Sequence, residues 1–222
     1  MTLILAHQID GKLVVVTNGA DTPGPKCCSF PHHPAILTGW GDYDLAPTAL
    51  CCSPSTVPPD QRKLIETNYI GDAFPSLKEG KENFVTAFER ELNGSPNVHN
   101  GGRGSAALLI AFACDSTIEA RVYDANSGNG SWRRRAGALD WPACFGQEHE
   151  VVAMLNTKGI KSPTDFMGNV KSIDDFAKRA IELITLTSDY LDAKDLPRSI
   201  GLAARLMLIS KDGSVSPPKK IA

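Results

Sequence analysis

The sequence opens on a β-hairpin signal, and this feature constrains the fold more than any other. Asp10-Gly11 separates two apolar segments rich in β-branched residues, 2–8 and 12–17. Both central residues of a type I′ turn need positive φ, which an Asp-Gly pair tolerates. Because both segments are nearly continuous apolar runs, we predict a hairpin that is buried on both faces. A buried strand that starts at residue 2 is unusual, since chain ends commonly fray.

The residue at the start of this hairpin can carry chemistry of its own. Thr2 follows Met1 directly. If Met1 is removed, Thr2 holds a hydroxyl and a free α-amine on one residue. An α-amine with a pKa near ~8 can take the hydroxyl proton through a water molecule. Thr2 is therefore a candidate nucleophile, and the alternative is a β-forming residue with no chemical role.

Composition limits the class of protein. The chain has 222 residues, 42% hydrophobic, and a net charge of −2, which suits one globular domain without general attraction to nucleic acid or anionic membranes. No apolar run approaches the roughly 20 residues of a membrane-spanning helix. The N-terminus has no basic region before its apolar stretch, and Gln8-Ile9-Asp10 interrupts that stretch too early for a signal peptide, so we expect a cytoplasmic protein. The run Arg133-Arg134-Arg135 is interpreted as a solvated edge or an inter-subunit contact.

The cysteines and histidines do not follow metal-ligand spacings. The six cysteines stand at Cys27-Cys28, Cys51-Cys52, Cys114 and Cys144. We interpret them as reduced and structural, with a redox or metal role as the alternative. His32-His33 beside the first pair leaves a zinc site open as a second alternative. We expect no metal and no organic cofactor.

Strand and helix signals are segregated along the chain. Residues 20–34 are turn-rich, 42–59 form an irregular Pro/Ser-rich insertion, and the tail 216–222 is expected to be disordered. The patterns predict strands at 35–39, 106–114, 118–123, 139–145 and 202–209. They predict helices at about 60–70, 76–92, 148–155 and from Ser172 on. A second Asp-Gly turn is predicted at 212–213. This order favours a layered α+β sandwich over a doubly wound sheet.

In this order of elements the chain resembles the proteasome β-subunit and HslV branch of the N-terminal-nucleophile hydrolases. The resemblance includes Thr2, the strand ending in Asn18-Gly19-Ala20, the strand ending in Gly39, and Ser199-Ile200-Gly201 before the last long strand. It implies a four-layer αββα sandwich, a single domain over residues 1–222, and assembly into a homo-oligomeric ring.

The resemblance also implies a set of site residues, with two departures. Thr2 matches the nucleophile, and Lys26 matches a lysine that lowers the pKa of the nucleophile. Where the family has an aspartate at the end of the second strand, this chain has Asn18, which can form hydrogen bonds but carries no charge. Where the family has a serine after a glycine, this chain has Gln147. Two further family positions, an aspartate and a serine near the end of the C-terminal helix, match Asp195 and Ser199.

The activity that the resemblance implies is that of a divergent N-terminal threonine amidohydrolase or peptidase. Thr2 Oγ would attack a peptide or amide carbonyl, the α-amine would act as base, and backbone N–H groups near Gly39 or Gly146 would form an oxyanion hole. The neutral Asn18 and Gln147 favour an alternative, a catalytically inactive proteasome-like structural or binding subunit. A third interpretation is an unrelated α+β protein.

Overall fold

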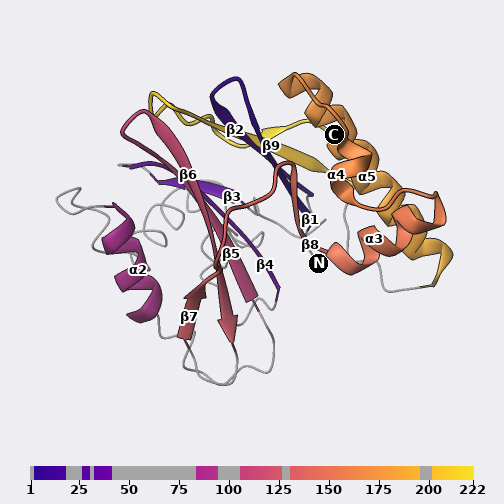
Figure 1. The fold of residues 1–222 in the computed structure, drawn as a ribbon, viewed down its shortest axis with the longest axis horizontal. Coiled ribbons are helices and arrows are strands. Elements are labelled where there is room, and N and C mark those ends of the chain that lie inside the picture. The colour runs from indigo at the N-terminus through magenta and orange to yellow at the C-terminus, as the bar shows by residue number, and fades with distance from the viewer. Residues whose placement is uncertain are drawn as a thin grey trace, which may run out of the picture. The chain divides into compact units, whose positions relative to one another are not determined.

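The protein is α+β, with two five-stranded antiparallel sheets (Figure 1). The computed structural model describes residues 3–18, 27–30, 33–41, 84–94, 106–126, 131–195 and 202–222. The chain divides into two compact units, one of residues 1–21, 113–118 and 138–222, the other of residues 22–112 and 119–137. Each unit is described by itself below.

The first unit contains the sheet that the N-terminal hairpin begins, in the order β10-β9-β2-β1-β8. Its strands are β1 (Leu3–Ile9), β2 (Lys12–Asn18), β8 (Ala143–Gly146), β9 (Ala204–Ser210) and β10 (Lys219–Lys220). Asp10 and Gly11 have φ of 49° and 72°, as the predicted hairpin turn requires. Residues 3–6 and 13–16 are at most 1% exposed, so the predicted burial of both faces of the hairpin is confirmed.

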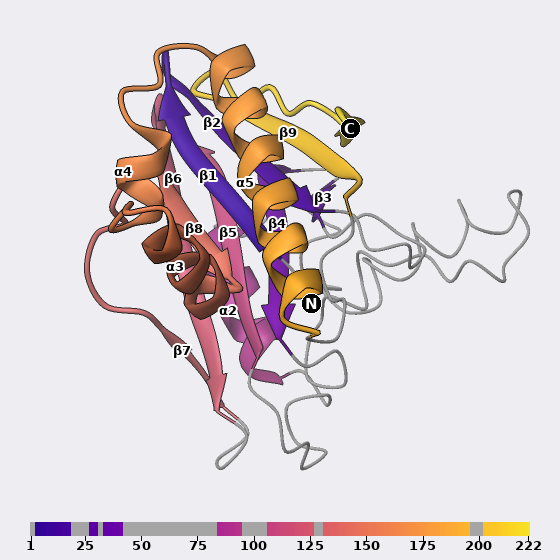
Figure 2. The same cartoon turned by 90° about the vertical axis from the view of Figure 1, so that its right-hand side faces the viewer.

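Three helices cover one face of this sheet: α3 (Glu148–Thr157), α4 (Pro163–Met167) and α5 (Ile173–Ala193). In Figure 2, α5 lies across β1 and β2. Alternate residues of the strands, among them Leu3, Leu5 and Val14, join one apolar core with Phe176 and Leu183 of α5. Burial of this face, rather than helix propensity, fixes the position of α5.

The predicted start of α5 is confirmed. The Ser172 hydroxyl accepts a hydrogen bond from the Asp175 backbone N–H at 3.1 Å, and its backbone is extended, as in an N-cap. The sequence patterns did not predict α4, because its five residues are too few to show a helical period. Its cap has the same form, with the Ser162 hydroxyl accepting from the Asp165 N–H at 3.0 Å.

The second unit contains one described helix and the sheet β3-β4-β5-β6-β7, except for the β5–β6 turn and the strand ends beside it, residues 113–118, which belong to the first unit. The elements are β3 (Cys27–Phe30), β4 (His33–Gly41), α2 (Phe84–Gly94), β5 (Ala106–Cys114), β6 (Thr117–Asn126) and β7 (Ser131–Arg134). Aromatic side chains join α2 to the sheet: the ring centroids of Phe84 and Phe112 are 5.8 Å apart, and those of Phe88 and Tyr123 are 5.7 Å apart.

Several sequence predictions need correction. The expected disordered tail instead forms β10, where the Ile221 N–H donates to the Ala204 carbonyl at 2.9 Å. The turn-rich segment 20–34 contributes a strand, β3, which pairs with β4. The strand expected over 139–145 begins only at Ala143.

The insertion 42–59 and the helix at 60–70 lie outside the described residues, as does the first half of the helix at 76–92.

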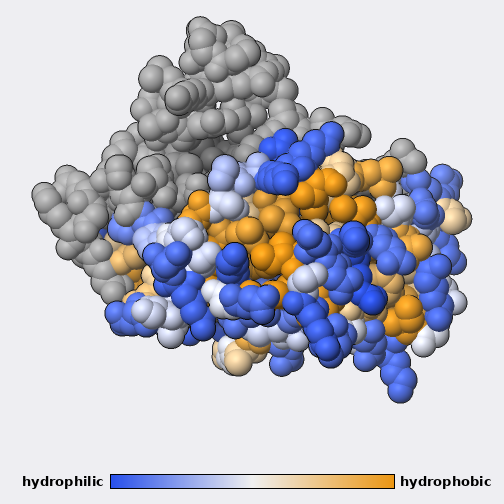
Figure 3. All heavy atoms as spheres, turned by 90° about the horizontal axis from the view of Figure 1, so that it is seen from above, coloured by the Kyte–Doolittle hydropathy of each residue, from blue (hydrophilic) through white to orange (hydrophobic). Residues whose placement is uncertain are grey.

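The remaining features of the fold are the hydropathy of its surface and of its helices. On the face shown in Figure 3, hydrophilic residues border a central group of hydrophobic ones. Within the ranges described above, none of the helices combines the length and apolar character that crossing a bilayer requires.

Candidate functional site

The start of β1 is fixed by a buried side chain at the end of β2. The backbone N–H of Leu3 donates a hydrogen bond to Asn18 Oδ1 at 2.7 Å, and both residues are fully buried. This N–H belongs to the peptide bond between Thr2 and Leu3. Asn18 therefore holds the peptide unit that follows the candidate nucleophile, at a point where water is excluded.

The end of β8 lies on the other side of the same strand start. Leu3 pairs with Gly146, whose φ of 97° is a conformation that L side chains rarely adopt. Gln147 follows as the N-cap residue of α3 and is 5% exposed. Its carbonyl accepts the first helical hydrogen bond, from the Val151 N–H at 3.0 Å. A glycine at this bend lets the chain turn from the strand into α3 beside the start of β1.

Three polar side chains are thus buried within the sheet ends around Leu3: Thr17, Asn18 and Gln147. Buried polar groups are costly unless they are hydrogen-bonded, so their placement marks this end of the sheet as different from the apolar core beside it. The carboxamides of Asn18 and Gln147 carry no charge. The arrangement can orient backbone and polar groups, whereas any ionic stabilisation of a reacting group must come from elsewhere.

The remaining predicted site residues are placed unevenly. Thr2, Lys26 and Ser199 lie outside the described residues. Asp195 follows the end of α5 and has a φ of 53°. Its side chain is exposed, whereas that of Asn18 is buried. Gly39 lies in β4 of the second unit, paired with Leu108.

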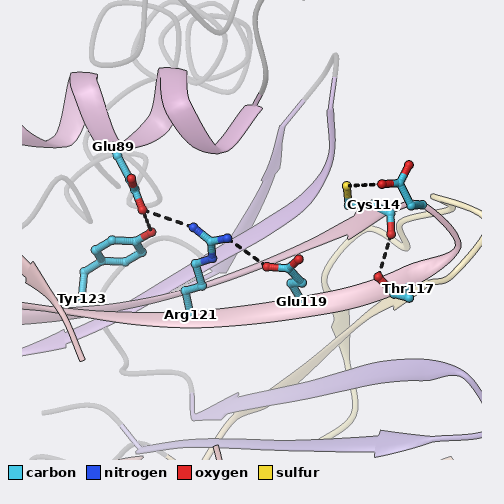
Figure 4. Close-up of polar contacts among 7 residues, drawn as sticks. Glu89, Cys114, Thr117, Glu119, Arg121 and Tyr123 are labelled. Atoms are coloured by element: carbon cyan, nitrogen blue, oxygen red, sulfur yellow. Dashed lines mark hydrogen bonds and ion pairs between the residues drawn. The ribbon is translucent and has the colours of Figure 1, made fainter. Parts of the chain in front are cut away.

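Sequence reasoning missed a polar cluster in the second unit (Figure 4). Glu89 of α2 accepts hydrogen bonds from the Tyr123 hydroxyl at 2.6 Å and from Arg121 Nη1 at 3.3 Å. Arg121 also bonds Glu119 at 3.0 Å, and its guanidinium lies 5.3 Å from the centre of the Phe112 ring. The sequence contains one signal for this cluster, because residues 119, 121 and 123 alternate along β6 and so share one face of the strand.

This cluster joins α2 to β6 and does not resemble a catalytic arrangement. Burial, with a contribution from Glu89, raises the pKa of Tyr123 to about 12. The phenol is therefore protonated near neutral pH, where it donates to the carboxylate and cannot act as a base.

The thiols and possible metal ligands are also informative. Burial, and to a lesser extent the charge of Glu148, raises the pKa of Cys144 to about 12, so this thiol is unreactive at neutral pH. Cys114, at the β5–β6 turn, donates to the Asp115 carboxylate at 3.6 Å. Within the described stretches, His, Cys, Asp and Glu side chains form no group of three or more that could hold a metal ion.

Comparison with known proteins gives a likeness of fold. No protein-family model matches the chain, and no curated protein sequence does. Among solved structures, the chain is similar to Anbu (ancestral beta-subunit) from Yersinia bercovieri, with a TM-score of 0.55 at 12% sequence identity. The match covers 99% of this chain and 86% of that chain. The fold is therefore proteasome-like, while the narrower resemblance to HslV is not supported by this match.

Proposed function

We propose that the protein is a divergent proteasome-like N-terminal threonine amidohydrolase or peptidase that uses Thr2 after removal of Met1. The observation that carries the proposal is the 2.7 Å hydrogen bond from the Leu3 N–H to Asn18 Oδ1. It fixes the peptide unit next to Thr2 inside a proteasome-like fold. A nucleophile gains most when its neighbouring backbone is held in place before the substrate arrives.

The proposed reaction forms and then hydrolyses an ester. Thr2 Oγ attacks the amide carbonyl carbon, and the free α-amine of Thr2 accepts the hydroxyl proton. The same proton then passes to the leaving amine as the C–N bond breaks. Water hydrolyses the acyl ester and regenerates Thr2. Lys26 supplies positive charge near the oxygen, and the backbone N–H of Gly146 is a candidate oxyanion-hole donor.

The proposal includes the finer features of the resemblance. It takes the two sheets to be the inner layers of a four-layer αββα sandwich, with Asp195 and Ser199 near the nucleophile. It also takes the protein to be a cytoplasmic homo-oligomeric ring that acts on peptides or small amides. The likeness of fold to a proteasome-like protein is the observation that supports the layered sandwich and the ring.

A second candidate function is favoured by one specific observation. The residue that contacts the Leu3 N–H is the neutral Asn18 rather than a carboxylate. Loss of a charge that balances a buried lysine costs on the order of 10²-fold in rate where it helps to position the base. The alternative is therefore a catalytically inactive proteasome-like structural or binding subunit.

Intact mass and covalent labelling separate the two candidates. The full chain is expressed without an N-terminal tag, and its mass shows whether Met1 is retained. A threonine-directed electrophile is then added, with hydrolysis of a fluorogenic peptide library as a second readout. The enzyme hypothesis expects loss of Met1, one label per chain, and no label in Thr2→Ala.

Two matched variants make the result specific. Thr2→Ser keeps a hydroxyl on the same atom and is expected to retain labelling. Thr185→Ala removes a hydroxyl from the exposed face of α5 and is expected to change nothing. Retention of Met1, or labelling that persists in Thr2→Ala, would contradict the catalytic proposal and favour the inactive subunit.

A further inference from the structure

β7 forms an edge of the second sheet and carries two exposed arginines. It is the last strand of the order β3-β4-β5-β6-β7 among the strands that the structure describes, so β6 pairs with one of its sides only. The Trp132 side chain is 6% exposed, and α2 contacts this strand. Arg133 and Arg134, which follow it, are both exposed. The strand is therefore anchored by a buried aromatic side chain and presents two arginines, which we call the basic edge.

The backbone of β7 has hydrogen-bonding groups that face away from β6. The Arg135 N–H, just past the strand, donates to the Val122 carbonyl at 2.8 Å, and Tyr123 is the cross-strand neighbour of Arg134. In an antiparallel pair, hydrogen-bonded positions alternate with positions that are not hydrogen-bonded. The N–H and carbonyl groups of Trp132 and Arg134 therefore point toward the open side of β7. An extended peptide binds groups of this kind when it adds one more strand to a sheet.

The carboxylate beside the basic edge is already bound. Asp124 is the cross-strand neighbour of Arg133, but it accepts two hydrogen bonds from Arg135, at 2.8 and 3.0 Å. Within the described part of the chain, neither Arg133 nor Arg134 forms an ion pair. The positive charge of the basic edge is therefore available to a partner.

The pair of Arg135 and Asp124 shows how an arginine of this segment holds a carboxylate on a neighbouring strand. Arg135 Nε and Nη2 bind one oxygen each, a fork that arginine forms and lysine cannot. A strand added on the open side of β7 would lie at the usual spacing of about 4.8 Å. Because consecutive strand residues belong to opposite faces, two consecutive acidic residues of that strand would each meet one arginine of the basic edge.

Two other occupants of this edge fit the observations less well. A second β7 edge would bring arginine opposite arginine, which is destabilising. Proteins that hold single-stranded nucleic acid offer aromatic side chains on which bases stack, whereas Trp132 is buried. The net charge of −2 also gives the chain no general attraction to nucleic acid.

We propose that the basic edge binds an extended segment of a partner protein that carries two consecutive acidic residues. The segment adds a strand beside β7, its backbone bonds to Trp132 and Arg134, and its carboxylates pair with Arg133 and Arg134. This binding does not depend on catalysis by Thr2, and it can be present or absent whatever the labelling experiment above shows.

Fluorescence anisotropy of a labelled peptide, Ser-Val-Thr-Glu-Glu-Val-Thr-Ser, measures binding to the full chain. We expect the affinity to fall as salt is raised, because exposed charges are screened beyond about 10 Å at 0.1 M. Arg133→Glu with Arg134→Glu is expected to weaken binding by at least about tenfold. The same double variant is expected to bind the peptide with Lys-Lys in place of Glu-Glu, a gain that excludes a folding defect. Lys161→Glu with Lys171→Glu reverses two exposed charges in the first unit and is the matched control.

Two N-methylated peptides distinguish strand addition from simple attraction between charges. Methylation of the first or of the second glutamate nitrogen removes an N–H from opposite edges of the extended peptide. One of these peptides is expected to bind at least about tenfold more weakly than the parent peptide, and the other is expected to bind like the parent. Thr2→Ala is expected to bind the parent peptide as the wild type does.

The proposal is overturned by a wild type that does not bind the acidic peptide, by an arginine double variant that binds it equally well, or by N-methylated peptides that bind equally. Loss of binding in Thr2→Ala would instead assign the peptide to the proposed catalytic site. Tighter binding of a single-stranded oligonucleotide, or self-association that the arginine double variant abolishes, would assign the edge to that other occupant. Without a peptide partner, the arginines would keep the simpler role of blocking edge-to-edge strand pairing.

Discussion

Replacing Asn18 by leucine tests the central feature of the candidate site. The substitution keeps a side chain of similar volume and removes the oxygen that accepts the Leu3 N–H. That donor is fully buried, and its hydrogen bond to Asn18 Oδ1 is 2.7 Å long. In the variant, the N–H of the Thr2–Leu3 peptide is left in an environment without water.

The expected cost follows from the burial of the donor. A buried donor without an acceptor destabilises a folded protein by about 1–3 kcal/mol. For a chain of this length, that corresponds to a fall of about 2–12 °C in the midpoint of thermal unfolding. If the site is catalytic, labelling of Thr2 should slow as well, because the peptide unit beside the nucleophile is no longer held.

Urea unfolding followed by tryptophan fluorescence and circular dichroism measures the difference in stability. Asn156→Leu is the matched control, because Asn156 lies on an exposed position of α3 and the chemical change is the same. The control is expected to change stability by less than about 0.5 kcal/mol. An Asn18→Leu protein as stable as the control would refute the view that this bond secures the start of β1.

The charged counterpart, Asn18→Asp, reports on the surroundings of the site. The aspartate can still accept from Leu3, but its charge is buried. Burial raises the pKa of a carboxyl group in the folded state above its unfolded value of about 3.9, so stability is full below that pH and is lost as pH rises. A lysine ammonium nearby would offset this loss. A small pH dependence that becomes large when Lys26→Met is added would place Lys26 beside position 18.

Three further outcomes are expected. Burial lowers the pKa of His7, so the folded state favours the neutral ring. The free energy of unfolding should therefore fall as pH decreases below about 6.5, the pKa of histidine in the unfolded chain. His7→Phe should remove this pH dependence, and a variant with the same dependence as the wild type would contradict the prediction. Tyr123→Phe removes the bond to Glu89 and should cost about 1–2 kcal/mol in urea unfolding, a result that equal stability would refute. A thiol reagent at neutral pH should modify Cys114 before Cys144 in the native protein, as peptide mass mapping can show, and the reverse order would argue against the raised pKa of Cys144.

The parts of the fold that the sequence predicted are those with local signals. Asp10-Gly11 fixed the hairpin turn, and Ser172 followed by acidic residues fixed the start of α5. The elements that it missed depend on long-range pairing. β10 has two residues and forms because β9 supplies its partners, and β3 forms beside β4 within a segment whose prolines suggested turns.

The candidate site was predictable only where local signals locate its residues. The position of Asn18 at the end of β2 follows from the strand pattern, and the neutrality of the site follows from its residue type. That its oxygen accepts from the Leu3 N–H depends on the register between β1 and β2, which pairs Ile4 with Thr17. For the cluster around Glu89, the alternation of residues 119, 121 and 123 along β6 is a local pattern, whereas their bonds to Glu89, 32 or more positions away, depend on how α2 packs on the sheet.

The bond to Asn18 has a chemical consequence for the durability of the protein. Asn18 is followed by Gly19, and asparagine before glycine is prone to spontaneous deamidation, in which the glycine nitrogen attacks the carboxamide carbon, ammonia leaves, and water opens the resulting succinimide. In the folded chain the strand conformation of Asn18, its burial and the hydrogen bond that holds its side chain in one orientation all oppose this cyclisation. Unfolded or aged material lacks this protection and would accumulate aspartate or isoaspartate at position 18, so the native hydrogen bond also preserves the chemical identity of the residue that makes it.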